Sequence, residues 1–223
     1  MVVLDAVQQL EYEPDFLAQS LRRGATPRAD GSVRFAVWAP AAESLRVRIH
    51  GGRAVGLHEL SPASGCEGEH EAVVTGASAG DDYTIVFPDG RELPDPVSRW
   101  QPHGVHGASR IVDPAAFEWS DAGWKGIPLA DYAIYELHVG TLTQAGTFEA
   151  AIAELPRLVA LGVTAIEIMP VAQFPGERNW GYDGVHLYAV QHSYGGPDGL
   201  KRLVDAAHAH GLAVVLDVVY NHL

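Results

Sequence analysis

The sequence predicts a chain of two domains, an immunoglobulin-like β-sandwich followed by the first three strands of a (β/α)8 barrel. Between residues 24 and 120, short β-rich segments alternate with turn residues, which is typical of a sandwich. Between residues 121 and 223, apolar strands alternate with helical patterns, the order of parallel βαβ units. Three parallel strands are too few for most architectures, so we expect a truncated, incomplete barrel. Residues 1–23 show a weak helical pattern and are interpreted as an appended segment.

Four strands are predicted in the first domain from alternating apolar and polar residues. They are residues 32–38, 45–50, 71–74 and 82–87. Asp30-Gly31 and Asp89-Gly90 have the composition of hairpin turns. Two aromatic residues, Trp38 and Tyr83, are expected to pack in the core. The stretch 94–114 is interpreted as a long surface connection.

The second domain is predicted from strands that alternate with helical patterns. The expected strands are 133–139, 163–169 and 212–216, and the expected helices run from Thr147 to Gly162 and from Pro197 to Gly211. Thr147 is a suitable amino-terminal cap, and Pro197 fits a first helical turn. Residues 170–196 form a connection far longer than the usual loop of about two to six residues. A long loop at the carboxyl end of a strand is a functional hint.

The composition excludes several classes of function. The 223 residues carry a formal net charge of −13, which disfavours the phosphate backbone of nucleic acids as a partner. No apolar run approaches the roughly 20 residues that span a bilayer, and the first residues have no basic region ahead of an apolar core. We therefore expect a cytoplasmic protein without nucleic-acid or membrane partners.

Metal and disulfide chemistry are also disfavoured by the sequence. Cys66 is the single cysteine, which excludes an intrachain disulfide and a cysteine-based zinc site. The 11 histidines include no pair with zinc-ligand spacing such as His-Glu-x-x-His. His208 and His210 are interpreted as part of a solvated helix face. We predict no metal and no cofactor.

Four motifs of the second domain point to a function. They lie on successive strands or loops. They are Tyr135-Glu136-Leu137-His138-Val139-Gly140-Thr141, Asn179-Trp180-Gly181-Tyr182-Asp183-Gly184, Tyr194-Gly195-Gly196-Pro197 and Asp217-Val218-Val219-Tyr220-Asn221-His222. Barrel enzymes keep their chemistry at the carboxyl ends of the strands, where the last of these motifs lies. In this order, the four motifs together resemble the α-amylase superfamily.

The resemblance extends to the first domain and covers nearly everything from Gly24 to Leu223. The segment 35–40 resembles the early-set, glucan-binding-like domain of branching, debranching and trehalose-releasing members. The connection 94–107, and Asp183 where branching enzymes usually carry Gln, resemble the trehalose-releasing members most closely. The resemblance implies a retaining glycoside hydrolase that acts on maltooligosyltrehalose, a capped maltooligosaccharide, and cleaves the α-1,4 bond next to its terminal trehalose unit.

The resemblance also implies roles for three substrate-binding residues. Tyr182 would form a stacking platform under the sugar at the cleavage site, since a flat ring matches the apolar face of a pyranose. Asp183 would order the polar network of the site, and His222 would hydrogen-bond a sugar hydroxyl. A purely structural role for Tyr182, as a core ring with its hydroxyl bonded to the backbone, is the alternative.

Three further residues are expected to be structural at the same site. Asp217 is mainly structural in the superfamily, and Trp180 is interpreted as a packing residue. Asn221 matches a residue that holds calcium in many amylases. Because trehalose-releasing members are not generally calcium enzymes, we assign no metal to it.

No catalytic residue is assigned in this chain, because the resemblance places the three catalytic carboxylates on later strands. A retaining glycosidase needs two carboxyl groups about 5 to 5.5 Å apart, one on each side of the scissile bond. The available carboxylates include Glu136, Glu167, Asp183 and Asp217, and no pair of them is expected to flank a cleft. Glu136 and His138 are interpreted as satisfied interior groups. We therefore expect the chain alone to be inactive, and its open strand edges to favour self-association.

Two other functions stay open. The chain is also compatible with a part of a glucan branching or debranching enzyme, which shares the cleavage chemistry but differs in substrate geometry. The third possibility belongs to another class, a noncatalytic glucan-binding module made of the sandwich and a barrel remnant. Glucan binding that does not depend on catalytic strands would favour this last function.

Overall fold

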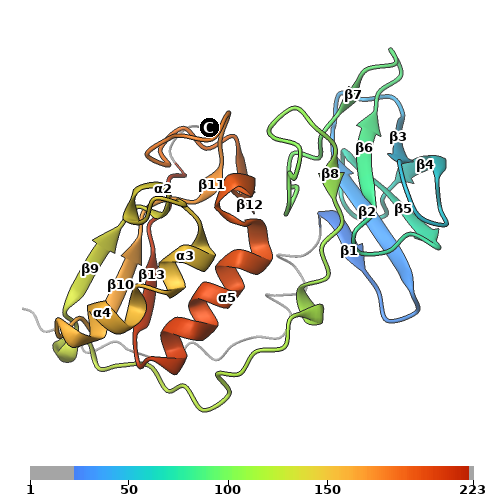
Figure 1. Ribbon diagram of the computed structural model, residues 1–223. Coiled ribbons are helices and arrows are strands. Elements are labelled where there is room, and N and C mark those ends of the chain that lie inside the picture. Colours follow the sequence, from blue (N-terminus) through green and yellow to red (C-terminus); the bar gives the residue numbers. More distant parts are fainter. Residues whose placement is uncertain (1–22, 221–223) are drawn as a thin grey trace, which may run out of the picture.

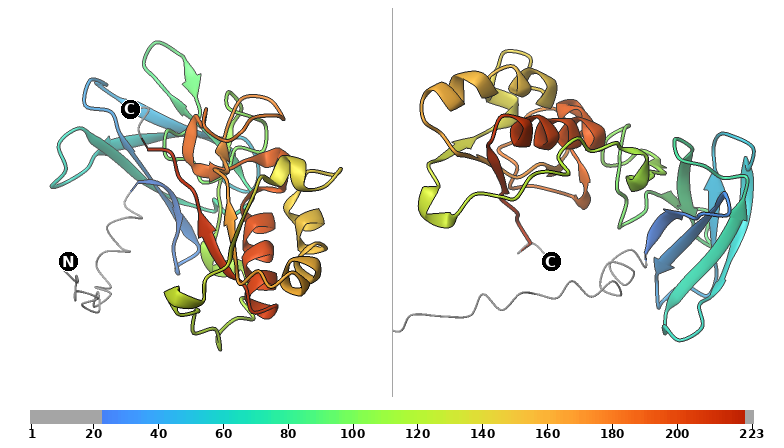
Figure 2. Two further views of the ribbon diagram at one scale, coloured as in Figure 1. Left: turned by 90° about the vertical axis from the view of Figure 1, so that its left-hand side faces the viewer. Right: turned by 90° about the horizontal axis from the view of Figure 1, so that it is seen from below.

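A computed structural model describes residues 23–220, which form a β-rich part and an α/β part (Figure 1). The expected segment 1–23, apart from Arg23, lies outside the described residues, as do Asn221 and His222. The two parts lie side by side and are joined by residues 111–133, called the connecting segment below (Figure 2).

In the described residues, eight strands form the sheet of the β-rich part. They are β1 (Gly24–Pro27), β2 (Ser32–Trp38), β3 (Leu45–Ile49), β4 (Gly56–Pro62), β5 (Glu69–Thr75), β6 (Asp82–Val86), β7 (Glu92–Leu93) and β8 (Ser109–Arg110). All strand pairs are antiparallel, in the order β1-β2-β5-β4-β3-β6-β7, and β8 also pairs with β6. The four expected strands correspond to β2, β3, β5 and β6, whereas the other four were not expected.

The sheet curls so that its two halves face each other across an apolar core. Phe35 of β2 and Tyr83 of β6 are not neighbours in the sheet order, yet their rings meet edge to face with centroids 5.1 Å apart. Both side chains are fully buried and share this core with Val47 and Ile85. The immunoglobulin-like type of this part stays a prediction.

The two expected hairpin turns are confirmed, and one core assignment is wrong. Gly31 and Gly90 have φ values of +78° and +87° in the turns that join β1 to β2 and β6 to β7. Such backbone conformations cost a glycine little. Trp38, which we expected in the core, is 52% exposed because it is the last residue of β2, and its indole N–H donates to the Glu67 carbonyl at 3.2 Å.

A parallel sheet forms the centre of the α/β part. Its described strands are β9 (Ile134–Leu137), β10 (Ala165–Ile168) and β13 (Ala213–Leu216), in the order β13-β10-β9. Helices α3 (Phe148–Ile152), α4 (Leu155–Ala160) and α5 (Gly196–Ala209) cover one face of this sheet (Figure 1). Leu155, Leu203 and Ile166 share the core between them. The pairing agrees with the expected βαβ units, and the barrel to which they would belong stays a prediction.

Two segments of the α/β part differ from expectation. The helix expected from Thr147 to Gly162 is broken into α3 and α4, because Pro156 has no N–H to donate to Ile152 and its ring crowds that carbonyl. The connection 170–196 is not a plain loop. It contains a short antiparallel hairpin of β11 (Ala172–Gln173) and β12 (His186–Val190), followed by the 3-10 turn η3 (His192–Tyr194). A short helix, α2 (Val139–Leu142), follows β9.

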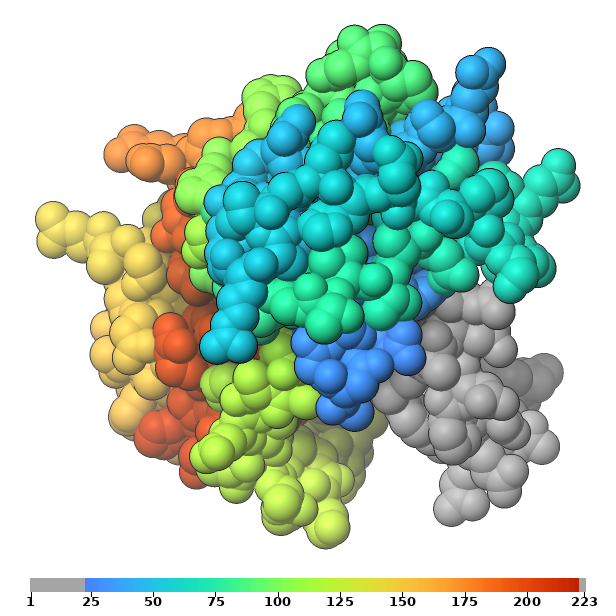
Figure 3. All heavy atoms as spheres, turned by 90° about the vertical axis from the view of Figure 1, so that its right-hand side faces the viewer, coloured from blue at the N-terminus to red at the C-terminus, as the bar shows by residue number. Residues whose placement is uncertain are grey.

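The connecting segment packs along α5 and contains two 3-10 turns, η1 (Pro114–Ala116) and η2 (Leu129–Asp131). The Asp121 carboxylate lies 2.7 Å from Nδ1 of His208, whose ring stacks on Trp124 with centroids 4.6 Å apart. The interpretation of His208 as a solvated residue is therefore wrong. Figure 3 shows this segment in yellow-green beneath the β-rich part, next to red atoms of the α/β part. Among residues 23–220, no helix has the length and apolar character needed to cross a bilayer.

Candidate functional site

The loop between β11 and β12, residues 174–185 and called the site loop below, lies over the carboxyl ends of the parallel strands. Beyond the end of β9, His138 Nε2 donates to the backbone carbonyl of Asn179 at 2.7 Å. Beyond the end of β13, the hydroxyl of Tyr182 donates to Asp217 Oδ2 at 3.2 Å. The site loop therefore connects the ends of the two outer strands of the described sheet.

Gly181 brings the site loop close to the end of β10. Its φ of +98° favours glycine, and a Cβ atom at this position would lie 2.2 Å from the carbonyl oxygen of Pro170. The Gly181 N–H donates to Asn179 Oδ1 at 2.7 Å, and the Asn179 side-chain amide donates to Asp183 Oδ2 at 2.8 Å. Asp183 thus fixes the shape of the turn through Asn179.

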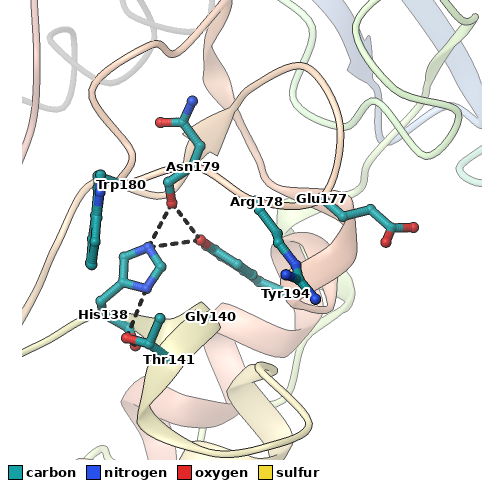
Figure 4. Close-up of a pocket in the computed structure, with 8 residues that line it drawn as sticks. All are labelled: His138, Gly140, Thr141, Glu177, Arg178, Asn179, Trp180 and Tyr194. Carbon is teal, nitrogen blue, oxygen red and sulfur yellow. Dashed lines mark hydrogen bonds between the residues drawn. The ribbon is translucent and has the colours of Figure 1, made fainter.

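A pocket of about 490 Å³ lies beside this turn (Figure 4). Its lining residues are His138, Gly140, Thr141, Glu177, Arg178, Asn179, Trp180 and Tyr194. The Trp180 ring meets the His138 ring edge to face with centroids 5.1 Å apart. Trp180 is nevertheless 64% exposed, so it is less buried than a packing residue would be. Tyr182 and Asp183 are not among the lining residues of this pocket.

The hydrogen bonds of the pocket place a proton on Nε2 of His138. Because a carbonyl oxygen only accepts, the contact with Asn179 requires the proton on Nε2. Nδ1 lies 3.2 Å from the Thr141 hydroxyl. The Tyr194 hydroxyl lies 3.2 Å from Nε2, and burial raises the pKa of Tyr194 to about 12. Tyr194 therefore stays a neutral phenol at neutral pH, and this wall of the pocket is a polar surface of fixed orientation.

Tyr182 combines an anchored hydroxyl with an accessible ring. Its side chain is 41% exposed although its hydroxyl is bonded to Asp217. Desolvation and the nearby Asp217 carboxylate raise the pKa of Tyr182, because both disfavour a phenolate. The phenol is therefore kept as a hydrogen-bond donor. Because the hydroxyl is hydrogen-bonded while the ring stays accessible, the ring face of Tyr182 can stack against an apolar ligand surface.

Two glutamates lie on the sheet near this site. Glu136 of β9 is directly beside Glu167 of β10 in the parallel register, so both side chains project from the same face. Both carboxylates contribute to the raised pKa of Tyr182. Glu136 is exposed, so its interpretation as an interior group is wrong. Within residues 23–220, no three His, Cys, Asp or Glu side chains are grouped in a way that could hold a metal ion.

The structure brings together several of the residues that the sequence singled out. Trp180, Tyr182 and Asp183 share one turn, and Asp217 contacts it. Asn179 and Tyr194 were not assigned a role from the sequence. Both belong to motifs noted there, and the available signals were the place of Asn179 in a long loop after a strand and that of Tyr194 before a glycine pair.

Comparisons with known proteins agree with this geometry. The family model described as alpha amylase, catalytic domain, matches residues 112–223, half of the chain. The chain belongs to the α-amylase family. A malto-oligosyltrehalose trehalohydrolase of Saccharolobus solfataricus is 49% identical over 194 residues, which are 87% of this chain and 34% of the relative. Its namesake in Deinococcus radiodurans is 48% identical over 202 residues, which are 90% of this chain and 32% of that relative.

A solved structure shows the same similarity in three dimensions. A Salmonella typhimurium protein assigned as an alpha amylase superposes with a TM-score of 0.85 at 47% identity. The match covers 90% of this chain and 33% of the Salmonella chain. The chain thus spans about a third of the length of the relatives it matches.

Proposed function

We propose that this chain supplies a substrate-binding portion of a trehalose-releasing glycoside hydrolase. One observation carries the proposal. The site loop lies across the carboxyl ends of parallel strands and presents two exposed aromatic residues there, Trp180 and Tyr182. This edge of a parallel α/β sheet is where barrel enzymes bind and convert their substrates.

The proposed roles follow from the contacts of each residue. The Tyr182 ring stacks under a glucose unit, and its bond to Asp217 fixes the tilt of the ring. Asp183 orders the turn through Asn179, and the exposed ring of Trp180 offers a second apolar surface beside the pocket. For His222, which lies outside the described residues, the resemblance supports a hydrogen bond to a sugar hydroxyl.

The proposed substrate is maltooligosyltrehalose. It is the compound named in the relatives that are 48 to 49% identical to this chain. A neutral sugar also suits a chain with a net charge of −13, which would repel an anionic ligand. The proposed domains are an immunoglobulin-like sandwich at 24–120 and the beginning of a (β/α)8 barrel at 121–223.

Binding without cleavage is proposed for the 223-residue chain by itself. Glu136 and Glu167 are adjacent on one face of one sheet, and Asp217 is engaged by Tyr182. All three carboxyl groups contribute to the raised pKa of Tyr182, so they lie around one hydroxyl group. The geometry of a retaining glycosidase, with one carboxyl group on each side of the bond, is therefore not supported by them.

The test is to incubate the purified chain with maltooligosyltrehalose and to measure both released trehalose and binding. We expect no trehalose by chromatography, and saturable binding by calorimetry that is tighter for the capped substrate than for an uncapped maltooligosaccharide of equal length. Trehalose release would contradict the proposed lack of catalysis. Equal affinity for capped and uncapped chains would favour a branching or debranching enzyme, and the absence of binding to either would refute the substrate-binding role.

A further inference from the structure

A buried polar network lies between the β-rich part and the site loop. On the β-rich side, the Tyr83 hydroxyl donates to Asp95 Oδ2 at 2.7 Å, and the Asp95 N–H donates to Ser109 Oγ at 3.0 Å. Tyr83, Asp95 and Ser109 are all at most 1% exposed. Because buried polar groups are costly when unpaired, this network rigidly fixes the start and the end of the segment 95–109.

Gln101 organises the same segment from within. Its side chain is completely buried, and Oε1 accepts from Ser98 Oγ at 2.9 Å and from Ser109 Oγ at 2.6 Å. Its amide nitrogen donates to the carbonyl oxygens of Gly104 and Gly107 at 3.4 and 3.3 Å. The same amide nitrogen also lies 3.4 Å from His186 Nε2. These contacts hold the turn around residue 105 in one conformation.

His186 connects this turn to the site loop. Its Nε2 lies 3.0 Å from the Val105 carbonyl oxygen, so Nε2 donates, and the side chain is 5% exposed. His186 is the first residue of β12 and immediately follows the site loop. In the hairpin register it lies opposite Gln173 of β11. Figure 1 shows β12 next to the green segment that leads into β8.

The other anchors of the site loop described above all lie in the α/β part. They are the bonds to His138 and Asp217 and the close approach to Pro170. The bond from His186 to Val105 differs because it ties the end of the loop to a segment fixed by the β-rich part. The orientation of Trp180 and Tyr182 thus depends on both parts of the chain.

We propose that His186 is a positioning residue, through which the β-rich part holds the site loop in its ligand-binding arrangement. His186 touches no ligand in this account and acts through the backbone of residues 174–185. Its effect on glucan affinity rests on the proposed function, whereas its effect on loop order does not. The proposal assigns the β-rich part a role in shaping the site.

The test compares three variants by hydrogen–deuterium exchange of the 174–185 amides and by affinity for maltooligosyltrehalose. His186→Phe keeps a ring but removes the donor, and we expect about tenfold faster loop exchange and about tenfold weaker binding. His186→Gln places an amide N–H near the Nε2 position and should restore both. His58→Phe is the matched control, because His58 also donates to a carbonyl, that of Ala54 at 2.8 Å, but within the β-rich part. It should leave the site loop unchanged.

Unchanged loop exchange in His186→Phe, or equal exchange in His186→Phe and His186→Gln, would overturn the proposal. If His186→Phe yields no folded protein, His186→Asn takes its place, because its shorter amide does not reach the Nε2 position. Its loop exchange should then exceed that of His186→Gln, and equal values would overturn the proposal. If the wild-type chain binds no sugar, the proposed function fails, while the exchange data still decide the role of His186.

Discussion

Gly181 and Tyr182 are neighbours in the site loop but meet different physical requirements. At Gly181 the requirement is backbone geometry, since φ is +98° and the Pro170 carbonyl leaves no room for a Cβ atom. At Tyr182 the requirement is an open ring with an anchored hydroxyl. The first residue sets where the turn lies, and the second provides the surface that we propose for the sugar.

Substitution of Gly181→Ala should disrupt the turn. The added Cβ would lie 2.2 Å from the Pro170 oxygen, so we expect sugar affinity to fall and the free energy of unfolding to fall by about 1 to 3 kcal/mol. Gly176→Ala is the matched control in the same loop, because Gly176 also has a positive φ of +77° but no atom within 4 Å of its Cβ position. Urea denaturation and calorimetry measure both effects, and equal losses in the two variants would contradict the role of the contact with Pro170.

Tyr182→Phe and Tyr182→Ala separate the ring from the hydroxyl. Loss of the hydroxyl alone should weaken sugar binding only about twofold, since its bond to the Asp217 carboxylate is exposed to competing water and the ring that contacts the sugar is kept. Loss of the ring should weaken binding about tenfold, the effect of roughly 1 to 1.5 kcal/mol of stacking. Titration calorimetry provides the affinities. Equal weakening in both variants would mean that the bond to Asp217, rather than the ring face, carries the function.

The residues of the site could be predicted only in part. Tyr182, Asp183 and Asp217 stand in short motifs whose position after a strand already suggests a site. Tyr194 and His138 are 56 positions apart, and their contact at 3.2 Å depends on the packing of η3 against the end of β9. Such a long-range contact has no local signal in the sequence.

At the scale of elements, Asp82 links two strands of the curled sheet. It lies at the start of β6 opposite Arg110 of β8, whose guanidinium donates to both carboxylate oxygens at 2.6 and 3.0 Å. His103 also lies 2.9 Å from this carboxylate. Desolvation alone would raise the pKa of Asp82, but the hydrogen bonds from Arg110 and His103 outweigh it and lower the pKa below 3.8.

This lowered pKa predicts a loss of stability in acid. Because the folded pKa lies below the unfolded one, the ionised Asp82 stabilises the fold fully above the unfolded value, and this contribution is lost as the pH falls through the folded value. Asp82→Asn should therefore lose less of its free energy of unfolding than the wild type between about pH 5 and about pH 2. Urea denaturation at several pH values measures this, and parallel curves for the two proteins would contradict it.

The elements also show where local patterns suffice. Asp30-Gly31 and Asp89-Gly90 predict their hairpins because a turn is decided by its own residues. The start of α3 after Thr147 was predicted correctly. The capping residue carries no information about where the helix ends, so the break that Pro156 introduces between α3 and α4 was missed. Trp38 was misplaced because strand alternation does not show where a strand leaves the core.

At the scale of the whole molecule, the described sheet of the α/β part has two open edges. Ile134 and Tyr135 of β9 and Leu216 of β13 are exposed, with Val218 and Tyr220 beyond it. Unpaired strand edges with apolar side chains favour association with another chain. The 223-residue chain is therefore expected to self-associate as its concentration rises.

Sedimentation velocity at increasing concentration tests this expectation. Leu216→Lys should shift the chain toward monomer, because a charge at an edge strand opposes pairing. Leu161→Lys is the control, since Leu161 is also exposed, at 68%, but follows α4 and belongs to no strand. If the wild-type chain stays monomeric at every concentration, the strand edges do not mediate self-association and the expectation is wrong.

The overall architecture was predictable because it depends on periodicity along each half of the chain. Alternation predicted four strands of the β-rich part, and the strand–helix order predicted parallel pairing. The curl that joins Phe35 to Tyr83, and the bond from His186 to Val105, were not predictable, because they join segments that are distant in the sequence.

In the function that we propose, the site loop recognises an α-glucan through Tyr182. The most direct measurement is saturation-transfer NMR of maltooligosyltrehalose with the wild-type chain and with Tyr182→Ala. We expect transfer from the wild-type chain to the protons of a terminal part of the sugar, and its loss in the variant. No transfer from the wild-type chain, or undiminished transfer from Tyr182→Ala, would contradict this function.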